Sequence, residues 1–308
     1  MLSLANLTPR ESYNAQTEDP FTKRVVQHLP KDLFGVWQFL AYLLFPPLYI
    51  AGPIITFNCF QSQLICPIPT NTTKVKWTQF FWTGFIIIAL DVLLHYNCLN
   101  AISLSFAWKE FESPFKVGFV GMWTLQFMYL KFLCFWRYFR TVSLFCDIVP
   151  PENMIRCVKN NCTFAGFWKT WHASFNKWTV RYMYVPMGGQ KTQHFTIWLI
   201  FIFIGLWHDL WWSWVAWALM NCLFFTVELV VTFFFSKPYW DWVRRIPGWA
   251  IVRSILGGWN SVIIMCSNLC ILFGFDHMPD FLRKTFLEPG GQFCSFSTVP
   301  FVSFLTLW

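Results

Sequence analysis

The sequence is poor in charged residues. Asp, Glu, Lys and Arg fill 12% of its 308 positions, against roughly 25% in an ordinary soluble domain. So few charges cannot cover a globule of this size with polar surface, which excludes a soluble enzyme. A disordered chain is excluded as well, because such chains are rich in charge and poor in aromatic residues, whereas 21% of this chain is aromatic. The composition therefore predicts an integral membrane protein.

The common signatures of soluble catalysis and of nucleic-acid binding are missing too. There is no Walker loop, no GxGxxG turn, no serine elbow and no CxxC pair, so we expect no metal and no cofactor. The 11 cysteines are scattered, mostly in or beside apolar runs, as buried thiols are. Cys157 and Cys162, which flank a basic loop, are the alternative candidates for a metal or thioester site. The net charge of +8 suits anionic lipid head groups or an anionic ligand better than nucleic acid.

Apolar runs divide the chain into membrane segments. A spanning helix needs about 20 apolar residues, because the hydrocarbon layer is roughly 30 Å thick. We expect an all-α, polytopic protein with six or seven membrane segments, in which residues 1–32 form a polar N-terminal segment and residues 33–308 the transmembrane domain. No cleavable signal peptide is expected. The segments are 33–57, interrupted by prolines; 77–108; 117–149; 195–235, which holds two segments or one span and a re-entrant piece; 249–275; and the shorter 293–308.

The stretch 153–207 contains six Lys and Arg residues but no Asp or Glu. Within it, aromatic residues recur at helical spacing over residues 167–184, which predicts an amphipathic helix lying along the membrane surface. Pro186 to Gly189 predict the turn that ends it. The residues of the aromatic face are Trp168, Trp171, Phe175, Trp178 and Tyr182.

Three polar side chains, His208, His172 and Asn176, are candidates for catalysis. His208 lies thirteen residues into the run 195–235, about 20 Å along a helix and so inside the bilayer, where ionisable groups usually face a cavity or a partner. The alternative is a neutral His bonded to a backbone carbonyl. His172 lies on the aromatic-flanked side of the predicted helix, with Asn176 one turn later on the same face; the alternative for His172 is contact with lipid or a Trp ring. Asp91 and His95, also one turn apart, more readily form a helix-packing hydrogen bond.

Four segments carry a family resemblance. They are FWKTWHASFNKWTVRYMYVPMGG (167–189), FIGLWHDLWWSWVAW (203–217), PPENMIRC (150–157) and PLYIAGPIITFN (47–58). Together they resemble the membrane-bound O-acyltransferases, and within them the glycerol-uptake-protein branch, which is related to Hedgehog acyltransferase. The resemblance covers roughly residues 35–275 and matches the spacing of the motifs as well as their letters.

The resemblance implies a multi-pass enzyme of the endoplasmic reticulum membrane, with the plasma membrane as an alternative. Its fold would enclose a catalytic tunnel through the membrane, and acyl-CoA would serve as co-substrate. The essential histidine of the family falls on His208, and a second motif position on His172, with Asn176 in the same motif. The resulting hypothesis makes His208 the general base, while His172 or Asn176 orients the acceptor or binds the oxyanion. The cations that suit the CoA phosphates, or alternatively lipid head groups, are Lys169, Lys177, Arg181 and Lys191.

Several functions fit the same motifs. The leading one is acyl transfer to a membrane lipid, with glycosylphosphatidylinositol remodelling as the guess at branch level. Protein N-palmitoylation of the Hedgehog acyltransferase type would need the same base. A non-catalytic or transport role is the alternative from another class, although only one broken span is visible and transporters tend to repeat them. Members of the branch usually carry further spans before residue 47, so the sequence is expected to be N-terminally short.

Overall fold

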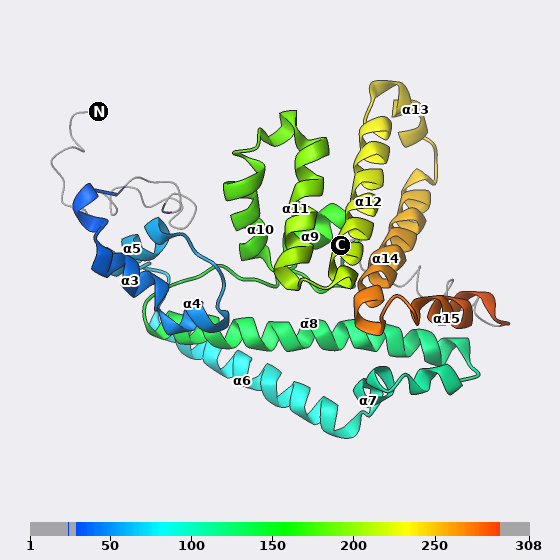
Figure 1. Cartoon of the computed structure of the whole chain (residues 1–308), viewed down its shortest axis with the longest axis horizontal. Coiled ribbons are helices and arrows are strands. Elements are labelled where there is room, and N and C mark those ends of the chain that lie inside the picture. Colours follow the sequence, from blue (N-terminus) through cyan, green and yellow to red (C-terminus); the bar gives the residue numbers. More distant parts are fainter. Residues whose placement is uncertain (1–23, 25–28, 290–308) are drawn as a thin grey trace. The chain divides into compact units, whose positions relative to one another are not determined.

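The computed structural model describes Arg24 and residues 29–289, and every regular element in those residues is a helix (Figure 1). These residues form two compact units. Unit 1 contains the described residues up to Val92, together with Lys131–Asn153 and His172–Phe175; unit 2 contains Leu93–Leu130, Met154–Trp171 and the described residues from Asn176 onward. The predicted boundary at residue 33 stays a prediction, because most of residues 1–32 lies outside the described part, as does the apolar run 293–308.

Four helices are long and apolar enough to cross a membrane, which confirms the predicted polytopic all-α class. They are α6 (Thr73–Tyr96), α8 (Pro114–Phe145), α12 (Trp212–Phe235) and α14 (Trp249–Phe273). With 24 residues, α6 and α12 are each about 36 Å long, enough for a hydrocarbon layer of roughly 30 Å. Most side chains of α6 are exposed, as expected of a helix that meets lipid.

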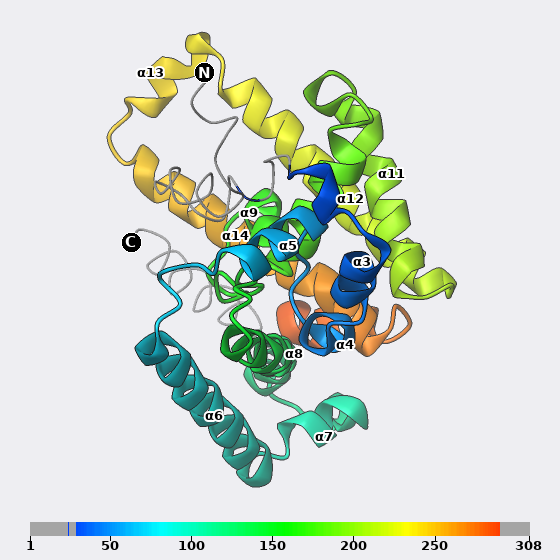
Figure 2. The same ribbon diagram turned by 90° about the vertical axis from the view of Figure 1, so that its left-hand side faces the viewer.

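The apolar stretch 33–57 is interrupted at its prolines, as predicted, and contains no single helix long enough to span a membrane. Figure 2 shows separate short pieces: η1 (Lys31–Leu33), α3 (Val36–Leu43), α4 (Pro46–Ala51) and α5, which begins only at Phe57 and runs to Ile65. Pro46 starts a new helix because proline fits the first helical turn but not a helix interior, and Gly52 after it is extended. The three α-helices pack around buried Phe60, and the Tyr42 hydroxyl donates to the Ile55 carbonyl at 2.8 Å.

The long apolar run 195–235 folds as two helices in unit 2, of which the second is long enough to span a membrane. α11 (Gln193–His208) and α12 lie side by side, and α14 packs on α12 (Figure 1). α11 and α12 approach closely at Gly205, where an added Cβ would lie 3.1 Å from the Cβ of Ala218 and from the Trp214 carbonyl oxygen. A hydrophobic core of this unit surrounds Trp108, between the start of α8, the end of α14 and α15 (Met278–Leu282).

The predicted continuous amphipathic helix over residues 167–184 is wrong. The segment consists of α9 (Phe164–Thr170), a break at Trp171 and His172, α10 (Ala173–Thr179) and the π-helix η3 (Val180–Tyr184). In a continuous helix the Ala173 N–H would bond to the carbonyl of Lys169. Instead it donates to the Asn153 carbonyl at 3.0 Å, while the Thr170 carbonyl accepts from the Ile155 N–H at 3.2 Å. Contacts remote in the sequence therefore override the helical spacing of the aromatic residues. The turn predicted at Pro186 to Gly189 is confirmed.

Candidate active site

His208 is the last residue of α11, and its imidazole lies among indole rings of unit 2. The ring stacks on Trp214 with centroids 4.7 Å apart and planes 9° apart, and it meets the edges of Trp217 at 5.6 Å and Trp207 at 5.0 Å. Asp209, directly after it, is extended and ends the helix. Trp217 is 4% exposed and touches Trp168 of α9 at 5.7 Å, which links the surroundings of His208 to that helix.

The helix that carries His208 is short. α11 has 16 residues and is therefore about 24 Å long, less than the hydrocarbon thickness of roughly 30 Å. The turn after it, Leu210 to Trp212, is exposed and apolar. A helix that enters a bilayer at Gln193 would thus end at His208 inside the hydrocarbon layer, in the manner of a re-entrant segment.

His172 occupies an unusual backbone conformation in unit 1. Its φ angle of +44° lies in the left-handed region, which costs a non-glycine residue of the order of 1–3 kcal/mol and persists only where the surroundings enforce it. The imidazole stacks on Trp136 of α8 with centroids 4.5 Å apart and on Phe175 with centroids 5.3 Å apart. The alternative predicted for His172, contact with a Trp ring, is therefore confirmed, and that ring lies 36 residues earlier in the chain. Strain of this kind gathers at functional sites.

Asn176 does not share a helix face with His172, and that prediction is wrong. α10 begins at Ala173, so His172 lies outside the helix, while Asn176 lies within it and its carbonyl accepts from the Thr179 hydroxyl at 2.9 Å. His172 belongs to unit 1, whereas Asn176 and His208 belong to unit 2. The three candidate residues are thus described in separate local surroundings.

The predicted cations of the acid-free segment are spread over several short elements of unit 2. Lys169 is exposed on α9, Lys177 on α10, and Lys191 at the end of η4 (Gly189–Lys191). The guanidinium of Arg181 lies over the Tyr182 ring, 5.7 Å from its centroid. Burial lowers the pKa of the Lys159 ammonium in the preceding loop.

Glu228 is a structural residue that the sequence reasoning missed. It lies within α12, yet its carboxylate accepts the N–H groups of Phe164 at 2.6 Å and Ala165 at 3.1 Å, the first residues of α9. The Asn260 amide of α14 also donates to it at 2.8 Å. A single carboxylate in an apolar helix costs free energy in a membrane and normally has a partner. Its presence in the apolar run was the sequence signal that could have identified Glu228.

Asn153 was missed as well, although it lies in the PPENMIRC motif. Its side chain is 0% exposed, and its Oδ1 accepts the Ser174 N–H at 3.0 Å. Its carbonyl accepts the N–H of Ala173. An asparagine shortly after two prolines was the available signal in the sequence. Nothing in the sequence indicates that its hydrogen-bond partners lie 20 and 21 residues later.

No group of three His, Cys, Asp or Glu side chains within Arg24 and residues 29–289 is arranged to hold a metal ion. The cysteines of these residues form no disulfide with one another. Cys157 lies with its sulfur 3.5 Å from the Gln126 amide oxygen, as a weak donor.

Comparison with known proteins agrees with the motif resemblance. The model of the membrane-bound O-acyltransferase family, MBOAT, matches residues 10–273. The chain is 36% identical over 273 residues to membrane-bound O-acyltransferase GUP1 of Saccharomyces cerevisiae, covering 87% of this chain and 46% of that protein. It is 34% identical over 279 residues to gup1 of Schizosaccharomyces pombe, covering 88% and 46%.

A more distant relative is named for a different acyl transfer, to a protein amine. Protein-cysteine N-palmitoyltransferase HHAT of Mus musculus is 24% identical over 266 residues, covering 81% of this chain and 52% of that protein. The chain spans about half the length of the curated relatives it matches. These matches confirm the resemblance predicted from the motifs, including the relation to the glycerol-uptake-protein branch.

Proposed function

The chain belongs to the membrane-bound O-acyltransferase family, and from that premise we propose that it transfers a long-chain fatty acyl group from acyl-CoA to a hydroxyl of a membrane lipid. The observation that carries the proposal is that His208 stacks on Trp214 and lies against Trp217 at the end of a helix too short to cross the bilayer. The residue is exposed, so its imidazole is open to a substrate.

His208 acts as the general base in the proposed reaction. The acceptor oxygen attacks the thioester carbonyl carbon while a neutral imidazole nitrogen of His208 takes the hydroxyl proton. The tetrahedral intermediate then breaks its carbon–sulfur bond, and the CoA thiolate leaves with that proton. Positioned proton transfer of this kind is worth about 10²–10⁴-fold in rate.

The other candidates take supporting roles. His172 or Asn176 donates a hydrogen bond to the developing oxyanion or orients the acceptor. The ammonium and guanidinium groups of Lys169, Lys177, Arg181 and Lys191 bind the phosphates of CoA, because cations on a stretch of sequence without Asp or Glu suit such anions. The reaction needs acyl-CoA as co-substrate and no further cofactor.

We place the activity in the endoplasmic reticulum membrane, with glycosylphosphatidylinositol lipids as the acceptor class. Both assignments rest on what the resemblance of the sequence motifs to the family implies. Transfer to a protein amine is the second candidate, favoured by the similarity to N-palmitoyltransferase HHAT. Both reactions use the same base, so the acceptor that becomes labelled decides between them.

The experiment is acyl transfer from labelled palmitoyl-CoA in membranes that contain the chain. We expect labelled product from the wild-type chain and a loss of at least about 10²-fold in His208→Ala at equal abundance. His194→Ala is the matched control, because His194 lies on the same helix at its first turn, and it should retain activity. Undiminished labelling by His208→Ala would contradict the role of His208, and background labelling by the wild-type chain would contradict acyl transfer.

A further inference from the structure

We propose that Asn153 is a positioning residue, which fixes His172 in its left-handed conformation by accepting the two backbone N–H groups that follow it. The inference rests on the proposed function in one respect, the role of His172 in acyl transfer. It goes beyond that function by assigning a role to the PPEN stretch of residues 150–153.

The two hydrogen bonds leave the backbone after His172 little freedom. The Asn153 carbonyl accepts the Ala173 N–H and its Oδ1 accepts the Ser174 N–H, both at 3.0 Å. The first N–H groups of a helix have no partner within the helix, and asparagine is among the best residues for satisfying them. Here the asparagine comes from a segment remote in sequence, so it fixes the start of α10 against another part of unit 1.

Ser174 receives a second contact from the same unit. Its hydroxyl accepts the Ile54 N–H at 2.9 Å, from the connection between α4 and α5. Ala173, Ser174 and Asn153 are at most 2% exposed. With the backbone of residues 173 and 174 held in this way, the chain entering from Trp171 turns through the left-handed region at His172. The ring is thereby placed between Trp136 and Phe175.

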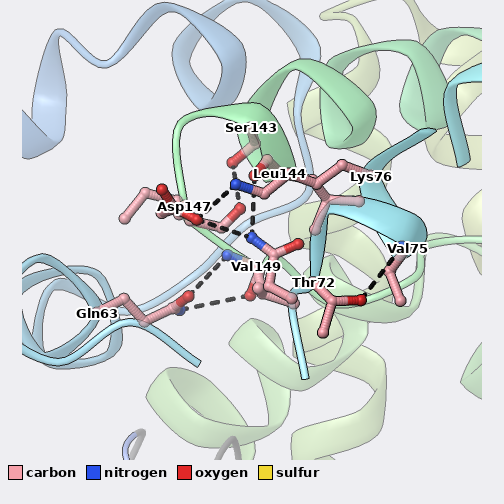
Figure 3. Close-up of polar contacts among 10 residues, drawn as sticks. Gln63, Thr72, Val75, Lys76, Ser143, Leu144, Asp147 and Val149 are labelled. Atoms are coloured by element: carbon pink, nitrogen blue, oxygen red, sulfur yellow. Dashed lines mark hydrogen bonds and ion pairs between the residues drawn. The ribbon is translucent and has the colours of Figure 1, made fainter. Parts of the chain in front are cut away.

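The turn that follows α8 and precedes Asn153 in the sequence is held by polar contacts from other segments (Figure 3). The Gln63 side chain, 1% exposed, accepts the Val149 N–H at 2.7 Å and donates to the Val149 carbonyl at 3.4 Å. Lys76 pairs with Asp147 at 2.7 Å. Two prolines, at 150 and 151, then restrict the backbone between this turn and Asn153. The amide is thus presented by a stiff segment, as a positioning group must be.

Two substitutions separate the acceptor oxygen from the bulk of the side chain. Asn153→Leu keeps the approximate size but leaves the Ser174 N–H without its acceptor. Asn153→Asp keeps an acceptor oxygen in the same place. We expect Asn153→Leu to lower kcat about 10²-fold, the scale associated with a misplacement of about 1 Å, with the KM for acyl-CoA unchanged. Asn153→Asp should recover most of that loss.

The decisive measurement is a double-mutant cycle with His172→Ala. If Asn153 acts through His172, the double variant will be no slower than His172→Ala alone, whereas independent effects would multiply. Multiplying effects would overturn the proposal. Gln61→Leu is the control, because Gln61 is another buried amide of unit 1, and it should leave kcat unchanged.

Hydrogen exchange gives a readout that does not depend on activity. The amides of Ala173 and Ser174 should be protected in the wild-type chain and should exchange faster in Asn153→Leu, but not in Gln61→Leu. Equal protection in all three would overturn the anchoring role. A wild-type chain that transfers no acyl group would refute the proposed function, and hydrogen exchange would still decide whether Asn153 holds the segment.

Discussion

Single polar side chains from remote segments satisfy the starts of two short helices. Glu228 accepts the first N–H groups of α9, and Asn153 accepts those of α10. Helices of seven residues have little stability of their own, because nucleation is costly. Their partners in the tertiary structure therefore decide where they begin, and the break that places His172 results from these partners.

Burial of a single side chain also argues against a glycan on Asn161, the first residue of an Asn-x-Ser/Thr glycosylation sequon. Asn161 of Asn-Cys-Thr is 5% exposed, its Nδ2 donates to the Cys157 carbonyl at 3.2 Å and its Oδ1 accepts from the Thr170 hydroxyl at 3.3 Å. A glycan on that nitrogen would displace these contacts. We expect no glycosylation at Asn161, so endoglycosidase treatment should cause no mobility shift that depends on this residue. A shift that disappears in Asn161→Gln would contradict the burial of this side chain.

At the scale of elements, the long apolar helices follow from sequence and the short ones do not. α6, α8, α12 and α14 were predicted because an apolar run of spanning length has few alternatives in a bilayer. The break at His172 could not be predicted, since its cause is the capture of two N–H groups by Asn153. The same limit applies to the stacking of His172 on Trp136, which no local pattern encodes.

The end of α11 at His208 illustrates the same limit inside the candidate site. The apolar helix that carries this histidine was predictable from the run of apolar residues. Its place at a helix end was not, because Asp209 is neither glycine nor proline and gives no stop signal. The surrounding indoles come from the hairpin between α11 and α12, so the site depends on how two helices pair.

Glu228 gives a prediction about how elements are joined. Its carboxylate binds α9 to α12 and receives the Asn260 amide of α14. Glu228→Ala would leave these donors unsatisfied, at about 1–3 kcal/mol for each buried one. We expect a lower unfolding temperature in detergent, with a smaller fall for Glu228→Gln, which keeps one acceptor oxygen. Glu112→Gln, on an exposed residue, should change nothing. Equal unfolding temperatures for Glu228→Ala and the wild type would contradict this role.

At the scale of the whole molecule, the candidate residues are divided between the two compact units. His172 and the residues that hold it belong to unit 1, and His208 with the neighbouring indoles to unit 2. The chain passes between the units at Trp171 and His172, the same place where the backbone is strained. The structure therefore describes the surroundings of each imidazole within its own unit.

The most direct measurement is a cryo-EM structure of the chain in lipid nanodiscs with a non-hydrolysable thioether analogue of palmitoyl-CoA. We expect the atom that replaces the thioester carbonyl carbon to lie within van der Waals contact of the His208 imidazole, about 4 Å. The CoA phosphates should meet the cations of the acid-free segment. An analogue bound elsewhere, with His208 turned toward lipid, would contradict the proposed role of His208 in acyl transfer.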